Sequence, residues 1–227
     1  MNRELAIQKI EKDFENISNL VLEQLQLLEE LFITKQRERA KEIFQLLRKN
    51  EEKIDRSEMQ LDELIIRTIV LYQPVAGDLR RLFAIYHMTI NLERVSDLVV
   101  AVTCTYMDLK DAELLEESRS ALKQMLKFTS KMVSSSLLSF MNKDQAMATR
   151  TINKDSTFDT LNKKLLKRTI KVAGLPKKSQ DILNNLLDMR SMFASLERIG
   201  DHATNIAESS IYAISGSNIR HQESKNE

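Results

Sequence analysis

The chain has 227 residues, of which 42% are hydrophobic and 30% are charged. Only four glycines and two prolines occur, whereas average usage would give roughly 16 and 11. Sandwiches, barrels and most α/β folds need a turn about every 8–12 residues, so this shortage of turn residues excludes them. The composition predicts an all-α protein built from long amphipathic helices.

The charge is nearly balanced, with 34 Lys and Arg against 33 Asp and Glu and a net charge of +1. Without a basic surplus, nucleic acid is a poor candidate partner. The N-terminal residues lack the apolar core of a signal peptide, and the lone cysteine, Cys104, suits a reducing compartment, so we expect a cytoplasmic protein. The apolar segment 82–107 carries Glu93, Arg94 and Asp97 in its middle, which favours a buried helix and leaves peripheral membrane contact at most.

Polar breaks divide the chain into six predicted helices. The breaks lie at residues 34–37, 73–78, 108–111, 142–144 and 173–176, and the last helix covers about 179–214. Pro74 disfavours helical backbone in the residue before it, and Asp78 is expected to cap a third helix that begins near Leu79. Gly174 followed by Pro176 is typical of a helix C-terminus.

The two halves of the sequence repeat. Leu-Glu-Arg-Val-Ser-Asp at 92–97 recurs as Leu-Glu-Arg-Ile-Gly-Asp at 196–201, and at the same offset of 104 residues Glu51-x-x-x-Asp55 recurs as Asp155-x-x-x-Asp159. Two motifs in register indicate an internal duplication. We therefore predict two tandem three-helix bundles, 1–108 and 109–214, that superpose on each other, followed by a flexible C-terminal tail at 215–227.

The repeated carboxylates are the candidate chemical groups. The sequence has no Gly-rich phosphate loop and no His-Glu-x-x-His or Glu-x-x-His motif. Glu93 and Asp97 interrupt an apolar stripe of the third helix, and Glu51 interrupts the apolar face of the second helix one turn before Asp55. Buried carboxylates are unfavourable unless paired, protonated or bound to a cation. Two such helices face to face would form an all-oxygen site suited to Mg²⁺, Mn²⁺, Ca²⁺ or iron.

The alternative is that Arg94 and Arg198 neutralise the acid pairs in structural salt bridges, which would leave a plain helical scaffold without metal. One arginine for two to four acids leaves a charge deficit, and this favours metal. In the second half Glu197 and Asp201 lie one residue beside the apolar stripe, so the sequence does not determine whether they are buried. His202 is expected to be a polar helix-face residue rather than a ligand.

These motifs, together with Gln73-Pro-x-x-x-Asp-Leu-Arg80 and the Asn205 that follows the second acid motif, resemble the PhoU family over almost the whole chain. The resemblance implies two similar three-helix bundles whose motif carboxylates bind divalent or trivalent metal ions. Iron, zinc, manganese and magnesium all remain open as the ion. The matching carboxylates are Glu51, Asp55, Glu93, Asp97, Asp155, Asp159, Glu197 and Asp201.

The resemblance also implies a function. It indicates a non-enzymatic, cytoplasmic negative regulator of phosphate uptake and phosphate-starvation signalling, which contacts the ATPase subunit of a phosphate transporter and a sensor histidine kinase. A helical accessory of a sodium–phosphate cotransporter is the alternative within the family. A carboxylate-bridged di-metal oxidoreductase is the rival from another class, disfavoured because the motifs lack histidine ligands.

We also expect a homodimer. Long amphipathic helices can carry more apolar surface than one core uses. The end of the fourth helix is the candidate surface, with Leu137, Leu138, Phe140 and Met141.

Overall fold

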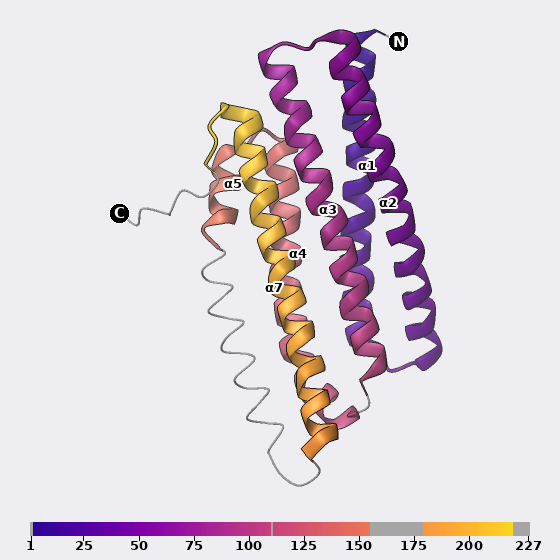
Figure 1. The fold of residues 1–227 in the computed structure, drawn as a ribbon. Coiled ribbons are helices and arrows are strands. Elements are labelled where there is room, and N and C mark those ends of the chain that lie inside the picture. Colours follow the sequence, from indigo (N-terminus) through magenta and orange to yellow (C-terminus); the bar gives the residue numbers. More distant parts are fainter. Residues whose placement is uncertain (1, 110, 155–178, 220–227) are drawn as a thin grey trace.

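The computed structural model describes residues 2–109, 111–154 and 179–219, and these residues form helices and no strands (Figure 1). This confirms the predicted all-α class. The helices are α1 (Arg3–Ile33), α2 (Arg37–Tyr72), α3 (Ala76–Asp108), α4 (Ala112–Met141), α5 (Gln145–Ile152) and α7 (Ser179–Ser215).

Short polar side chains begin several of these helices. The side chain of Asn2 accepts a hydrogen bond from the backbone N–H of Leu5 at 2.9 Å. Asp111 and Asp144 accept equivalent bonds at the starts of α4 and α5, at 2.9 and 2.8 Å. Each bond satisfies one of the N–H groups that the first helical turn leaves without a backbone partner. The predicted breaks at 108–111 and 142–144 therefore have a direct structural cause.

The predicted start of α3 is wrong by one turn. The helix begins at Ala76, with Val75 as its N-cap and no side-chain capping bond. Asp78 lies inside the first turn, where its carboxylate is 3.8 Å from Arg3 and favourably placed in the field of the helix N-terminus. Gln73 has φ 43°, so α2 ends directly before Pro74 and the chain can re-enter a helix without Asp78 as a cap.

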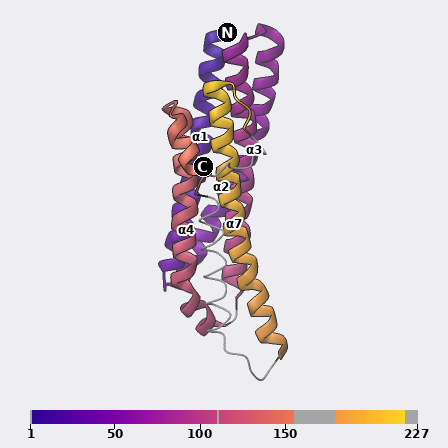
Figure 2. The ribbon, with the colours of Figure 1, turned by 90° about the vertical axis from the view of Figure 1, so that its left-hand side faces the viewer.

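The helices form two groups that share one apolar core. α1, α2 and α3 pack on one another, α4 and α5 pack on α7, and the groups meet along the α3–α7 and α1–α4 contacts (Figures 1 and 2). The ring of Phe14 on α1 meets that of Phe140 on α4 edge to face, with centroids 5.5 Å apart. Residues 155–178, including the expected helix end at Gly174 and Pro176, lie outside the described residues, so the superposition of the two halves stays a prediction.

α3 is apolar on most of its circumference because α1, α2 and α7 all contact it. Its fully buried side includes Leu82, Ile85 and Leu92. The stripe that carries Glu93 and Asp97 is a half-buried flank of this helix rather than its core face, and Phe83 near its start is 45% exposed. None of the described helices has an apolar stretch long enough to cross a membrane.

The end of α4 differs from the expected docking surface. Leu137 and Phe140 are each only 2% exposed and belong to the core, whereas Leu138 and Met141 are 43% and 48% exposed. The apolar residues that follow one another along this helix therefore divide between its two faces. Two of the four face solvent, too few for the continuous patch that the sequence suggested.

Candidate metal site

Carboxylates from α2 and α3 meet on one flank of the first bundle. One carboxylate oxygen from each of Asp55, Glu93 and Asp97 lies within 4.8 Å of the other two, and all three residues are half-buried. Glu51, one turn before Asp55, is also half-buried. Burial raises its pKa, and the charges of Asp55 and Asp97 raise it further. The four carboxylates predicted for the first half therefore lie in one electrostatic environment, and three of them converge.

Two further acids extend this group. Glu58 and Asp62 are half-buried on α2 and repeat the spacing of Glu51 and Asp55 seven residues later. Seven residues correspond to two helical turns, so both pairs occupy the same flank of the helix. That repeated spacing was the available sequence signal, and it was missed. We call the whole group the acidic seam: Glu51, Asp55, Glu58, Asp62, Glu93 and Asp97.

Burial and neighbouring negative charges raise the pKa values of several carboxyl groups in the acidic seam. Burial raises the pKa of Glu93 to about 7, and the neighbouring charge of Asp97 contributes in the same direction. Burial raises the pKa of Asp62 to about 6, with Glu58 as the next cause. The pKa values of Asp55 and Glu58 are raised as well, again chiefly by burial. Both burial and neighbouring like charges disfavour the ionised form of a carboxylate.

The seam has limited cationic compensation. The guanidinium of Arg94 lies 3.4 Å from the Glu93 carboxylate and 3.7 Å from that of Asp97, so the expected salt bridges of this arginine are present. Even with this neighbour, the pKa of Glu93 stays raised. Among the described residues, no hydrogen-bond partner reaches the buried Oδ1 atoms of Asp55 and Asp62. Two carboxylate oxygens of the seam are therefore partly removed from water without accepting a hydrogen bond.

These donors fit a hard cation. Two oxygens on opposite sides of one ion lie about 4.2 Å apart around Mg²⁺ and up to about 5 Å apart around Ca²⁺. The oxygens of Asp55, Glu93 and Asp97, which all lie within 4.8 Å of one another, are therefore close enough to bind one such ion together. The unpartnered Asp55 oxygen provides the independent sign that the donor set is incomplete without a cation or proton.

The second set of predicted ligands is only partly visible. Asp155 and Asp159 lie outside the described residues. Glu197 is half-buried and Asp201 is exposed, beside the buried Phe193 and Leu196. No ion pair of Arg198 is found within the described ranges.

His202 bridges the two halves instead of joining a described acid group. Its Nδ1 lies 2.9 Å from the Oδ1 of Asn91 on α3. The amide of Asn91 donates to the His87 carbonyl at 2.8 Å, which leaves Asn91 Oδ1 as the acceptor facing the imidazole. Asn205 donates to the same oxygen at 3.1 Å. Burial, with Arg198 and Arg94 nearby, lowers the pKa of His202 to about 4, so the ring is neutral at pH 7.

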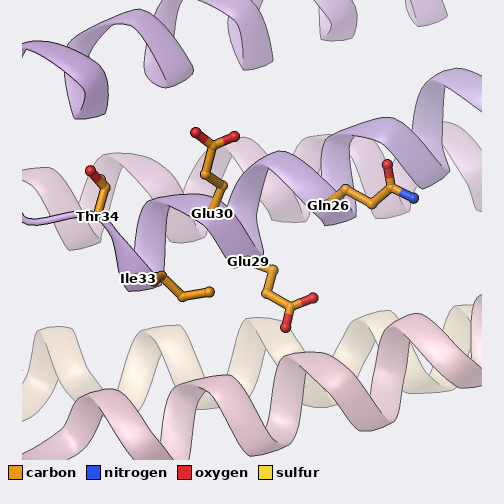
Figure 3. A pocket seen from close by; sticks show the side chains of 5 residues that line it. All are labelled: Gln26, Glu29, Glu30, Ile33 and Thr34. Atoms are coloured by element: carbon orange, nitrogen blue, oxygen red, sulfur yellow. The ribbon is translucent and has the colours of Figure 1, made fainter.

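A pocket at the end of α1 has no comparable cluster of converging carboxylates. It has a volume of about 440 Å³ and is lined by Gln26, Glu29, Glu30, Ile33 and Thr34 (Figure 3). The two glutamates point in different directions, and Glu30 is held by Arg39 at 2.7 Å. Diverging carboxylates, one of them already paired, offer no shared binding point for a ligand.

Known proteins resemble this chain in both sequence and structure. The family model described as "PhoU domain" matches residues 14–104 and 122–210. A PhoU homolog of the phosphate-specific transport system from Burkholderia is 33% identical over 78% of this chain and 75% of its own length. One from Methanothermobacter thermautotrophicus is 29% identical over 92% of both chains. The crystal structure of PhoU from Pseudomonas aeruginosa superposes with a TM-score of 0.80 at 26% identity, covering 95% of this chain and 100% of that one.

Proposed function

The chain belongs to the PhoU family, and we propose that it is a cytoplasmic negative regulator of phosphate uptake and of phosphate-starvation signalling. The relatives are named as accessory proteins of a phosphate-specific transport system, which supports a role in phosphate transport. A second similar structure, from Streptococcus pneumoniae, is described as a phosphate transport system regulatory protein; it has a TM-score of 0.80 at 25% identity and covers 95% of this chain and 98% of its own.

Regulation by this chain would proceed through protein contacts rather than catalysis. We propose that it docks on the ATPase subunit of a phosphate transporter and on a sensor histidine kinase, and damps both when phosphate is abundant. The described part of the molecule is made of long packed helices, whose outer faces can present a binding surface.

The acidic seam would supply a metal-dependent element of this regulator. Asp55, Glu93 and Asp97 would hold a divalent or trivalent cation such as iron, zinc, manganese or magnesium, and Glu51 and Glu58 would add negative charge around it. The bound ion would neutralise the seam and tie α2 to α3. By the internal repeat, we propose the equivalent role for Asp155, Asp159, Glu197 and Asp201 in the second half. The convergence of three carboxylates from two helices is the observation that carries the metal proposal.

A gene deletion with complementation tests this function. In phosphate-rich medium the deletion should raise phosphate uptake and phosphatase expression, and the intact gene should restore both. The double variant Glu93→Gln with Asp97→Asn, which keeps side-chain shape, should restore them poorly. Glu113→Gln with Glu117→Gln, an exposed acid pair of equal spacing on α4, is the matched control and should restore them fully.

The outcomes separate the parts of the proposal. Unchanged uptake and phosphatase expression in the deletion strain would contradict the regulatory role. Full restoration by the Glu93/Asp97 variant would contradict the role of the seam alone. Retention of the transporter ATPase subunit and of the histidine kinase by the immobilised protein tests the two partners directly.

A further inference from the structure

Gln24 is a buried polar residue on the apolar side of α1. Its side chain is fully buried and interrupts a stripe that includes Val21, Leu25 and Leu28. Its amide Nε2 donates a hydrogen bond to the backbone carbonyl of Leu47 on α2, at 3.2 Å. Its Oε1 atom has no hydrogen-bond partner among the described residues. A buried amide with an unused acceptor is less favourable than an apolar side chain, so its presence in this core requires an explanation.

Asn50 on α2 is the counterpart of Gln24. It is 4% exposed, follows Leu47 by three residues, and its Nδ2 atom also has no hydrogen-bond partner within the described ranges. Five residues along a helix correspond to a rotation of about 140°, so Asn50 and Asp55 point to different sides of α2. The Asp55 side faces Asp97 on α3. Because α2 packs against α1 and α3, the buried Asn50 lies on the side that α1 covers.

The bond from Gln24 reaches the backbone of α2 at the level of the acidic seam. In an α-helix the carbonyl of residue 47 accepts the N–H of residue 51, so Gln24 contacts the same oxygen as the backbone N–H of Glu51. Consecutive helical residues are about 100° apart. The direction in which Asn50 faces α1 therefore also determines the direction of Glu51 and, one turn later, of Asp55.

A hydrogen bond restricts the rotation of a helix more narrowly than apolar packing does. Burial of apolar surface has no preferred direction, whereas a hydrogen bond weakens steeply when its donor and acceptor are misaligned. Single buried polar residues can fix the register of packed helices at some cost in stability. The ion pair of Glu30 with Arg39 also joins α1 to α2, but it lies about three turns before Glu51. Gln24 and Asn50 are the buried polar groups at the level of the seam.

We propose that Gln24 and Asn50 are positioning residues for the carboxylates of the acidic seam. By restricting the rotation of α2 against α1, they direct Glu51 and Asp55 towards the carboxylates of α3. The functional meaning of this inference rests on the proposed metal site, because residues that orient metal ligands raise the affinity for the metal. The rotation itself is a property of the metal-free fold and is tested separately.

Cross-linking of the metal-free full chain tests the rotation. The native cysteine is replaced by serine, and Asp55→Cys with Asp97→Cys places two thiols where the carboxylates of α2 and α3 meet. Dibromobimane, which becomes fluorescent when it bridges two neighbouring thiols, should bridge this pair rapidly. Gln24→Met with Asn50→Leu in the same protein should slow the bridging several-fold. Gln26→Met, which changes an exposed glutamine of α1, is the matched control and should leave the rate unchanged.

Metal titration of the protein without the added cysteines tests the functional part. Calorimetry with Mg²⁺, Mn²⁺, Zn²⁺ or Fe²⁺ measures the dissociation constant, and the binding that Glu93→Gln with Asp97→Asn removes identifies the site in the first half. Gln24→Met with Asn50→Leu should raise this dissociation constant about tenfold or more. Its free energy of unfolding in urea should stay equal or rise, because apolar groups of similar shape replace both buried amides. A pair with a structural role alone would lose stability and keep its metal affinity.

The outcomes separate the two proposals. An unchanged bridging rate in Gln24→Met with Asn50→Leu would overturn the positioning role, whatever the metal result. An unchanged dissociation constant in that variant, with a wild type that binds metal, would overturn it as well. A wild type that binds none of the four ions would contradict the metal proposal, and the bridging rate would then decide the positioning role alone. Gln24→Met and Asn50→Leu as single variants give the same comparison if circular dichroism shows that the double variant does not fold.

Discussion

Glu93 connects the chemistry of the acidic seam to the pH dependence of stability. Its side chain is 19% exposed, and burial together with Asp97 raises its pKa from 4.5 to about 7. In metal-free protein the folded state therefore keeps this proton up to about pH 7, whereas the unfolded state loses it near pH 4.5. The stabilisation from this group is complete below pH 4.5 and is lost as the pH rises through 7.

Removal of that titration is a direct prediction. In the presence of a chelator, the free energy of unfolding of the wild type should fall by up to about 3 kcal/mol between pH 4.5 and 7, since one pKa unit corresponds to about 1.4 kcal/mol. The Glu93→Gln variant should not show this fall. Urea unfolding at several pH values measures it. His202 acts in the opposite sense, because its lowered pKa removes stability as the pH falls from 6.5 towards 4. It is present in both proteins, so their difference isolates Glu93. Parallel pH profiles would contradict the raised pKa.

At this scale the sequence identified the acid pairs but not their surroundings. The four-residue spacing and the interrupted apolar stripes located Glu51, Asp55, Glu93 and Asp97. Whether a carboxylate on α2 lies near one on α3 depends on how each helix is rotated about its axis. That rotation is determined by packing throughout the core. Glu58 is an example: the sequence shows that it interrupts the apolar pattern of α2, but not that it lies near Glu93 on α3.

Arg81 on α3 connects this helix to both α1 and α4. It forms an ion pair with Glu11 on α1, and its guanidinium lies 4.6 Å from the ring centroid of Phe140 on α4. One side chain of α3 thereby contacts both other helices at the junction of the two groups. The planar guanidinium can pair with a carboxylate and stack on a ring at the same time, which an ammonium does less well.

We expect Arg81→Ala to lower the free energy of unfolding by about 1–3 kcal/mol, since it removes a cation–π contact and a partly buried ion pair. Arg56→Ala is the matched control, because its pair with Glu52 is long and exposed, and it should have an effect near zero. Equilibrium urea unfolding compares the two. Equal losses in both variants would show that Arg81 contributes no more than a surface arginine.

Helix ends were predictable where one local residue determines them. Asp111 and Asp144 cap helices at the predicted breaks, and Gln73 leaves helical geometry directly before Pro74. Asp78 failed as a predicted cap because the backbone re-enters a helix at Ala76, three residues past the left-handed Gln73. Helix faces were harder to predict, since α3 is contacted from three sides and its apolar residues do not reveal which side is innermost.

At the scale of the whole molecule, the two halves are connected by polar as well as apolar contacts. Asn91, two residues before Glu93, is hydrogen-bonded to His202, the residue after Asp201. Asn205, which has Ala101 as its counterpart in the first half, adds a bond to the same oxygen. The repeated motifs of the two halves thus lie close to the α3–α7 contact, where a change in one motif can reach the other helix.

The charge of the acidic seam is the central feature of this molecule, and metal addition tests it most directly. A cation bound only by the folded state stabilises it by about 2.7 kcal/mol at one hundred times its dissociation constant. The measurement is the Tm of metal-free protein with and without added Mg²⁺, Mn²⁺, Zn²⁺, Ca²⁺ or iron. We expect at least one ion to raise the Tm by several degrees, and Glu93→Gln with Asp97→Asn to reduce that rise without destabilising the metal-free protein. A Tm unchanged by every ion, with the double variant less stable than the wild type, would contradict a metal site and indicate that Arg94 and its neighbouring arginines balance the charge of the seam.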